Sequence, residues 1–303
     1  MRILFAGTPE TAVTVLEGLM KSGHEIVGVL TREDAKVGRK QALQESPVAR
    51  FASDKGIPLI KANKVDSTAE LQISELGADL AIVVAYGTLL KQSTLDLLAL
   101  GWFNLHYSLL PLHRGAAPVQ HAILSGESVT GVSVFKIDQG MDTGPILGST
   151  KTVIGPLETC GELTQRLSEL GVGLLNELLP QIYSGMSSIS EQSGQASMAP
   201  KLNRADAKLD LSRSAQGLEL VVRAMNPEPI AWLNYDGEPF RVLRAKAEIT
   251  ATGSLGELVG DSEPIVVCGQ NTGLRLVEVQ PAGKKIMSGT DWFRGLRSNG
   301  RFS

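Results

Sequence analysis

The sequence of 303 residues predicts an α/β protein with a doubly wound, mostly parallel sheet, followed by a small β-barrel of the OB type. Three observations support this. Short apolar runs alternate with amphipathic segments up to residue 185, a stretch rich in Ser and Gln occupies 186–205, and short β-prone runs separated by turn residues fill 206–303. We therefore predict a first domain at 1–185, a linker at 186–205 and a second domain at 206–303.

The elements of the first domain are predicted from their apolar pattern and their flanking residues. A near-continuous apolar run is typical of a parallel strand that is covered on both faces. A helix is expected where an apolar period follows Pro47 and stops at Gly56. By these criteria, strands are expected at 2–7, 25–31, 78–87, 102–110 and 130–137, and helices at 10–23, 47–56, 117–126 and 158–185.

The second domain is predicted to be mostly β. One helical segment is expected at 215–229, and the runs that follow are short, rich in β-branched residues and separated by Gly, Asp and Pro. Strands are expected at 231–237, 240–249, 256–260, 264–269 and 273–281.

The composition predicts a soluble globular protein, with 43% hydrophobic residues, 20% charged residues and a formal net charge of −3. No stretch approaches the roughly 18–20 uninterrupted apolar residues of a membrane span. The apolar start turns at Gly7, before it reaches the length of a signal-peptide core. Cys160 and Cys268 lie far apart and form no CxxC pair. We therefore expect a reducing, cytoplasmic setting.

The charge is distributed unevenly. Residues 201–303 hold 14 Lys and Arg against 12 Asp and Glu, whereas residues 1–200 hold 15 against 20. The segment Thr31 to Ser46, after the second predicted strand, lacks an apolar period and contains Arg39 and Lys40. Each basic segment is either a solvated surface or a contact for a polyanion, and charge alone leaves both interpretations open.

Several common motifs are absent. The turn FAGTPE has one glycine where a dinucleotide-binding loop needs three, and no GxxxxGK[ST] occurs. Ser108 does not lie in GxSxG, which argues against a serine hydrolase. His106, His113 and His121 are close in sequence, but their spacing matches no common zinc pattern. We expect no metal.

Asn104, His106 and Asp142 form the remaining candidate site. Asn104 and His106 are two positions apart, so on a strand they share a face. Asp142 lies in a glycine-flanked turn after the next predicted strand, and two such strands side by side would bring their carboxyl ends together at one edge. An amide, an imidazole and a carboxylate there could bind an oxyanion, move a proton and orient the imidazole. Ordinary polar residues at strand ends remain the alternative.

Two motifs carry a resemblance to a known family. NLHYSLLPLHRGAAPVQHAI begins at Asn104, and DQGMDTGPIL begins at Asp138. Together they resemble the signature of the folate-dependent formyltransferases. The resemblance extends over nearly the whole chain, from ILFAGTPE near the start to QPAGKK at Gln280 to Lys285.

The resemblance implies a Rossmann-like catalytic core that uses 10-formyltetrahydrofolate and no metal. It assigns catalysis to Asn104, His106 and Asp142. The Asn104 amide and protonated His106 would stabilise the oxyanion, and Asp142 would orient His106 and help to remove the ammonium proton. It places the folate against the segments SLLP and VVAYG, so that the expected cofactor-binding residues are Ser108, Leu109, Leu110, Pro111, Tyr86 and Gly87.

Within the family, the resemblance is to the members that formylate the α-amino group of methionine on initiator tRNA for translation initiation. It implies that the basic loop and the basic OB-like domain contact the acceptor arm and backbone of the tRNA, through Arg39, Lys40, Lys284 and Lys285. It also implies a monomer without DNA or membrane partners. Two alternatives stay open. One is another folate formyltransferase or hydrolase with a different acceptor, and the other is a non-catalytic RNA-binding protein.

Two positions depart from the family pattern. Tyr107 stands where glycine is usual, and His113 stands where an aromatic residue often precedes the Arg-Gly pair. We expect Tyr107 to narrow the folate pocket.

Overall fold

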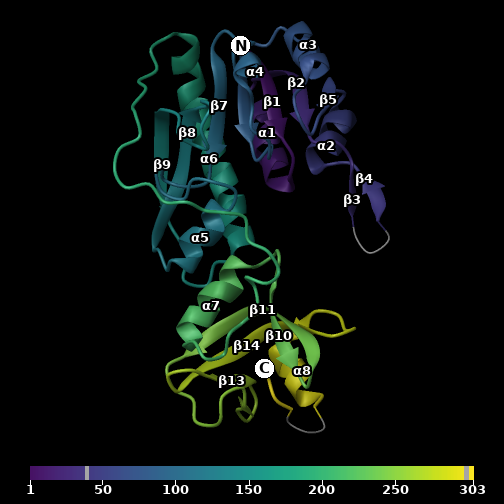
Figure 1. The fold of residues 1–303 in the computed structure, drawn as a ribbon, viewed down its shortest axis with the longest axis vertical. Helices are drawn as coiled ribbons and strands as arrows, with labels where there is room; N and C mark the ends of the chain where they lie inside the picture. Colours follow the sequence, from purple (N-terminus) through teal and green to yellow (C-terminus); the bar gives the residue numbers. More distant parts are fainter. Residues whose placement is uncertain (38–40, 297–299) are drawn as a thin grey trace. The chain divides into compact units, whose positions relative to one another are not determined.

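The structure, a computed structural model, describes residues 1–37, 41–296 and 300–303 and divides into two compact units (Figure 1). The first unit comprises Met1–Pro118, Val129–Val153 and Thr164–Pro200. The second comprises Val119–Ser128, Ile154–Leu163 and Lys201–Ser303. Each unit is built from segments that are far apart in the sequence.

The first unit contains a seven-stranded sheet in the order β5-β2-β1-β6-β7-β8-β9. The five strands from β5 to β7 are parallel, whereas β8 runs antiparallel to β7, and β9 antiparallel to β8. This confirms the predicted doubly wound, mostly parallel sheet. The strands are β1 (Arg2–Gly7), β2 (Glu25–Thr31), β5 (Leu59–Lys61), β6 (Leu80–Val84), β7 (Gly101–His106), β8 (Val129–Lys136) and β9 (Ile146–Val153).

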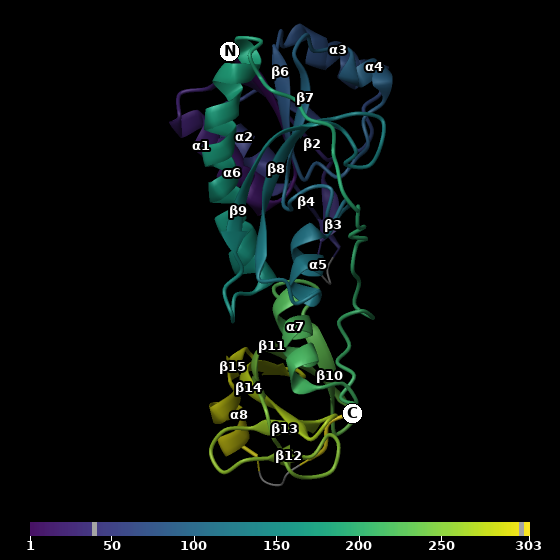
Figure 2. The ribbon, with the colours of Figure 1, turned by 90° about the vertical axis from the view of Figure 1, so that its left-hand side faces the viewer.

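Helices cover both faces of this sheet (Figure 2). Helices α3 (Ser67–Glu75) and α4 (Gln92–Leu95) cover one face, where Ile73 packs in a core cluster with Leu4 and Trp102. Helices α1 (Glu10–Lys21), α2 (Pro47–Lys55) and α6 (Cys160–Tyr183) lie on the other face. Added Cβ atoms at Gly18 and Gly171 would meet Val172 and Leu105, so α6 lies close against both α1 and β7.

Side-chain alternation along β7 decides which face carries the candidate site. Trp102 belongs to the core on the α3 and α4 side, whereas Leu105 packs against α6. Because side chains alternate along a strand, Asn104 and His106 share the Trp102 face. The site therefore lies on the face away from α6.

Local capping signals explain where α2 and α3 begin. The Ser46 hydroxyl accepts a hydrogen bond from the Ala49 amide at the start of α2, and Gly56 ends that helix at φ +67°. The Asp66 carboxylate accepts a hydrogen bond from the Ala69 amide at the start of α3. These are ordinary N-caps, and a positive φ favours glycine at the end of a helix.

A short hairpin follows β2. It consists of β3 (Ala35–Val37) and β4 (Ala42–Gln44). The residues just outside the two strands are Asp34 and Glu45, and the Lys61 Nζ at the end of β5 lies 2.7 Å from a carboxylate oxygen of each. These two hydrogen bonds raise the pKa of the lysine above its usual value. Lys61 therefore joins both ends of the hairpin to the main sheet.

The second unit contains a six-stranded sheet in the order β10-β11-β14-β13-β12, with β15 paired to β14. It also includes α5 (Pro118–Leu124), except its first residue, and the first turn of α6. The remaining elements are α7 (Ala215–Ala224), β10 (Ala231–Tyr235), β11 (Glu238–Glu248), β12 (Leu258–Val259), β13 (Ile265–Cys268), β14 (Thr272–Pro281), β15 (Met287–Ser288) and α8 (Gly289–Arg294).

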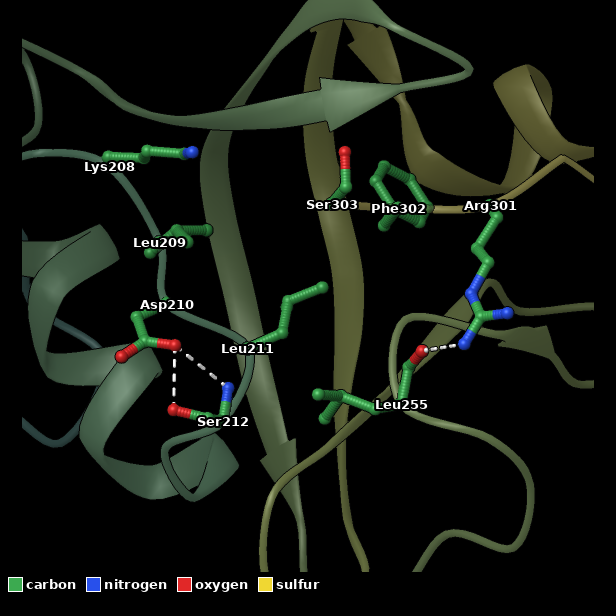
Figure 3. A pocket seen from close by; sticks show the side chains of 9 residues that line it. All are labelled: Lys208, Leu209, Asp210, Leu211, Ser212, Leu255, Arg301, Phe302 and Ser303. Carbon is green, nitrogen blue, oxygen red and sulfur yellow. Dashed lines mark hydrogen bonds between the residues drawn. The ribbon is translucent and has the colours of Figure 1, made fainter.

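Residues 301–303 connect the two ends of this sheet. Phe302 forms a bridge with Tyr235 at the end of β10, and Arg301 forms a bridge with Glu257 next to β12. Figure 3 shows the Arg301 guanidinium donating a hydrogen bond to the Leu255 carbonyl. The sheet thereby closes into a small barrel around the Phe302 ring, which confirms the predicted OB-like domain.

The predicted strands and helices correspond to elements of the structure, and the sequence reasoning missed β5, α3, α4, β9, the hairpin, β15 and α8. Within the described ranges, no helix combines the length and the apolar character that a membrane span requires.

Candidate active site

Asn104, His106 and Asp142 come together in the first unit. Asn104 and His106 lie on β7, where they pair with Phe135 and Ser133 of β8. Asp142 lies in the loop between β8 and β9, and its Oδ2 is 3.8 Å from the Nδ1 of His106. The structure thus brings an imidazole and a carboxylate together beside an amide.

The route by which Asp142 reaches this place differs from the expected one. We expected the carboxyl ends of two neighbouring strands to meet, but β8 is antiparallel to β7, so its carboxyl end pairs with Phe103. The loop after β8 instead turns back toward His106. The Asp142 backbone adopts φ +53°, a conformation that non-glycine residues rarely occupy, and its Oδ2 accepts a hydrogen bond of 2.7 Å from the Gly115 amide.

His106 is buried and held in one tautomer. Its Nε2 lies 2.9 Å from the backbone carbonyl of His113. Because a carbonyl only accepts hydrogen bonds, Nε2 carries the proton and Nδ1 faces Asp142. The His113 carbonyl, and not the Asp142 carboxylate, therefore sets the tautomer.

The environment of His106 favours its neutral form. Burial lowers the pKa of the imidazole below its usual value, while the Asp142 carboxylate and the His113 carbonyl oppose that shift. The distance of 3.8 Å to Asp142 exceeds a hydrogen bond, so Nδ1 stays available to accept a proton. The expected protonated His106 would then arise only once Nδ1 has accepted a proton.

Asn104 supplies an unused amide. Its side chain is half-buried, and within the described part of the chain it makes no hydrogen bond. An amide N–H group beside a proton-accepting imidazole can stabilise negative charge on a reacting oxygen. The three side chains together can therefore support attack on an acyl carbon.

The segment Ser108 to Pro111 follows β7 directly. Ser108 is fully buried, and its hydroxyl donates to the Leu112 carbonyl. Leu109 is half-buried against Gly131 of β8, and the Leu110 amide donates to the Ser133 hydroxyl. Pro111 is half-buried and follows a cis peptide bond. The Ser108 hydroxyl thus holds the loop that carries the His113 carbonyl.

Tyr86 and Gly87 lie beyond the end of β6. The Tyr86 ring is buried in the core on the α3 side, where its hydroxyl donates to the Ala62 carbonyl at 2.6 Å. Burial raises the pKa of this hydroxyl to about 12. Gly87 is exposed, and an added Cβ would lie 3.7 Å from the Arg32 guanidinium. The Tyr86 side chain is therefore part of the core, whereas Gly87 is exposed just after the end of β6.

Tyr107 lies on the opposite face from His106. Its hydroxyl is 2.9 Å from the hydroxyl of Ser168 in α6, and burial raises its pKa to about 12. The expectation that Tyr107 narrows a pocket on the His106 side is therefore wrong, because the ring packs toward α6.

A hollow of about 740 Å³ lies on the Trp102 side of the first unit. The loop that carries Asp142 forms one wall, with Ile137, Asp138 and Gly140, and the segment around α4 forms another, with Leu95 and Leu98. None of the expected folate-binding residues lines it. A smaller hollow of about 460 Å³ lies in the second unit beside residues 301–303, and its lining includes none of the predicted site residues (Figure 3).

The structure describes two of the four expected tRNA-binding residues. Arg39 and Lys40 lie outside the described residues. Lys284 and Lys285 are exposed in the turn between β14 and β15 of the second unit. Among the residues the structure describes, no group of three or more His, Cys, Asp or Glu side chains is placed to hold a metal ion.

Comparison with known proteins identifies the family. The formyl transferase family model matches residues 1–179, and the model of the formyl transferase C-terminal domain matches 201–297. The chain is 42% identical to the methionyl-tRNA formyltransferase of Renibacterium salmoninarum, over 98% of this chain and 97% of the relative. It is 43% identical to that of Thermobifida fusca, with the same coverage. The chain belongs to the methionyl-tRNA formyltransferase family.

Solved structures support the fold of this methionyl-tRNA formyltransferase family member. An N-formyltransferase from Helicobacter canadensis, in complex with folinic acid and dTDP-3-aminofucose, has a TM-score of 0.68 at 18% identity, covering 92% of this chain and 98% of that one. HypX from Aquifex aeolicus, in complex with tetrahydrofolic acid, has a TM-score of 0.69 at 16% identity, covering 97% of this chain and 47% of that one.

Sequence reasoning missed two groups that contact the site residues: the His113 carbonyl and Gln192. A backbone carbonyl leaves no signal in the sequence. Gln192 lies in the segment predicted as a linker, where composition gives no reason to single it out.

Proposed function

We propose that the enzyme transfers the formyl group of 10-formyltetrahydrofolate to the α-amino group of methionine on initiator tRNA. The single observation that carries the proposal is the convergence of Asn104, His106 and Asp142 on one face of β7. The similarity of nearly the full chain to methionyl-tRNA formyltransferases also supports the proposal.

In the proposed reaction, the amine nitrogen attacks the formyl carbon and a new C–N bond forms. The Asn104 amide donates a hydrogen bond to the oxyanion that develops on the formyl oxygen. His106 Nδ1 accepts the proton that the amine loses, and the Asp142 carboxylate at 3.8 Å stabilises the resulting imidazolium. The intermediate collapses as the bond to N10 of the folate breaks, and N10 takes up the proton that His106 accepted.

The folate is proposed to bind at the carboxyl ends of β6 and β7, next to Asn104 and His106. The expected cofactor-binding residues follow these two strands: Tyr86 and Gly87 come after β6, and Ser108, Leu109, Leu110 and Pro111 come after β7. Open α/β sheets typically bind their ligands at this edge. The buried Tyr86 and Ser108 would support the site, whereas the exposed Gly87 would lie against the ring.

The acceptor tRNA is proposed to contact Arg39 and Lys40, and to contact the second unit through Lys284 and Lys285. Exposed lysines fit contacts to phosphates, which position a nucleic acid without reading its sequence. Residues 1–185 would then form the catalytic domain, 186–205 the linker and 206–303 the tRNA-binding domain. The proposal includes a monomer that acts in the cytoplasm.

The test uses purified protein, 10-formyltetrahydrofolate and methionine-charged initiator tRNA, with charged elongator tRNA in parallel. Formyl-methionine formed on the initiator alone would support the proposed acceptor. Folate turnover with water or a small amine, without formylation of either tRNA, would favour the alternative of a folate-dependent enzyme with another acceptor. Absence of any turnover would favour a non-catalytic RNA-binding protein.

A further inference from the structure

Gln192 connects two loops at the candidate active site, the turn of Asp142 and Gly144 and the loop of Arg114. Its amide nitrogen donates to the Asp142 carbonyl and to the Gly144 carbonyl, both at 2.8 Å. Its amide oxygen accepts from the Nε and Nη2 of Arg114, at 3.1 and 2.7 Å. An amide side chain has two N–H donors and two acceptor lone pairs, so these four bonds use its full capacity.

The segment around Gln192 is firmly attached on both sides. Ser190 and Ile146 exchange two backbone hydrogen bonds, of 2.8 and 2.9 Å. The backbone amide of Arg114 donates to the Ser197 carbonyl at 2.8 Å, and the backbone carbonyl of Arg114 accepts from the Ala199 amide at 2.7 Å. We call residues 190–199 the strap. Although its composition resembles a linker, its hydrogen bonds tie it to the loops that carry Asp142 and Arg114.

The turn that carries Asp142 needs such support. Asp142 adopts φ +53°, which is strained for a residue with a side chain, and strained residues persist only where the surroundings hold them. Gln192 holds the carbonyls of Asp142 and Gly144, and the Gly115 amide holds the Asp142 carboxylate at 2.7 Å. The turn is therefore held from the strap and from the loop after β7.

We propose that Gln192 is a positioning residue, which keeps the Asp142 carboxylate beside the His106 imidazole while touching no reacting atom. This inference rests on the proposed function, because it assumes that Asp142 acts in formyl transfer. Gln192 acts through the backbone of Asp142. Its loss lets the turn relax and moves the carboxylate, and a misplacement of about 1 Å in such a site can lower the rate roughly 10²-fold.

Three variants test the inference. Gln192→Leu removes all four hydrogen bonds at similar volume. Gln192→Glu keeps acceptors for Arg114 but places a carboxylate against two carbonyl oxygens. Gln195→Leu is the matched control, since Gln195 is an exposed glutamine of the same strap. We expect both Gln192 variants to lower kcat about 10- to 100-fold with KM for folate and tRNA within twofold, while the control behaves as wild type.

A double-mutant cycle separates positioning from a general structural role. In an Asp142→Asn background, we expect Gln192→Leu to cost less than threefold in single-turnover rate, because the group it positions is already disabled. In an Asn104→Ala background, it should retain its full effect. Thermal unfolding of every variant shows whether the protein is folded, and if Gln192→Leu does not fold, Gln192→Glu decides.

Wild-type kcat in a folded Gln192→Leu variant would overturn the inference. So would full activity in Gln192→Glu, since the bonds to Arg114 would then suffice. An unchanged cost of Gln192→Leu in the Asp142→Asn background would also overturn it. If Asp142→Asn alone leaves kcat unchanged, the proposed catalytic role of Asp142 is wrong. The outcomes above test only the role of Gln192.

Discussion

Replacing Asn104 with alanine should separate catalysis from stability. The Asn104 amide makes no hydrogen bond within the described part of the chain, so its removal leaves no protein group without a partner. The side chain is half-buried on the Trp102 face of β7, and we expect the free energy of unfolding to change by less than about 1 kcal/mol. In catalysis, however, the amide is the proposed donor to the oxyanion.

The size of the catalytic effect follows from this role. Loss of one oxyanion donor typically lowers kcat by about 10²–10³-fold, or roughly 3–4 kcal/mol of transition-state stabilisation. Because the ground-state carbonyl binds the donor more weakly than the oxyanion does, KM for both substrates should change little. The expected signature is therefore a large loss of kcat with an almost unchanged melting temperature.

The assay combines single-turnover formylation of charged initiator tRNA with thermal unfolding of the same preparation. Tyr107→Phe is the near-neighbour control. It removes a hydroxyl that faces Ser168 on the other side of the sheet, so it should cost about 1 kcal/mol of stability and leave kcat intact. A loss of kcat below tenfold in Asn104→Ala would refute the assigned role. So would a loss of kcat accompanied by a large drop in melting temperature.

Three further predictions concern protonation and tRNA binding. Burial lowers the pKa of His106, and its neutral form accepts the proton, so the imidazole should lose its charge below pH 6.5, the ordinary histidine value. A His106 imidazole that titrates at or above pH 6.5 in an NMR titration of the enzyme would contradict this. Lys61→Met frees both ends of the hairpin whose strands flank Arg39 and Lys40 in the sequence, so it should weaken tRNA binding in filter-binding assays and leave KM for folate unchanged. The control Lys64→Met, at an exposed lysine, should change neither tRNA binding nor KM. Replacing Lys284 and Lys285 with alanine should reduce the slope of log K against log salt by roughly one for each phosphate that the protein no longer neutralises, and an unchanged slope would remove them from the interface.

The sheet was largely predictable because each central strand is a self-contained apolar run. The ranges expected for β1 and β2 coincide with the observed strands, since glycine or polar residues border them in the sequence. The strand β5 has only three residues and no such signal. Helix α3 was missed although Asp66 caps it, because its apolar residues form no clear period.

The direction of β8 could not be predicted from local pattern. A helix lies between β7 and β8, which is typical of a right-handed crossover joining parallel strands. In this chain, α5 belongs with the second unit apart from its first residue, and β8 returns antiparallel. The proximity of Asp142 to His106 was expected for a reason that proved wrong, and a loop turning back toward β7 achieves it instead.

The candidate site was predictable only in its side chains. Asn104, His106 and Asp142 stand out by residue type and spacing. The groups that hold them are backbone atoms, such as the His113 carbonyl and the Gly115 amide, together with one glutamine in a polar segment. Hydrogen bonds between distant loops depend on the folded path of the chain, which residue types do not reveal.

The bridge between Tyr235 and Phe302 has a consequence for synthesis of the protein. The two residues are 67 positions apart, and a ribosome adds residues at about 5–20 per second, so β10 waits several seconds for its partner. During that interval, the Tyr235 edge and the space for the Phe302 ring face the solvent. Synonymous codons that slow elongation after Tyr235 should therefore increase aggregation of the nascent chain, although the finished protein would have the same sequence and the same stability.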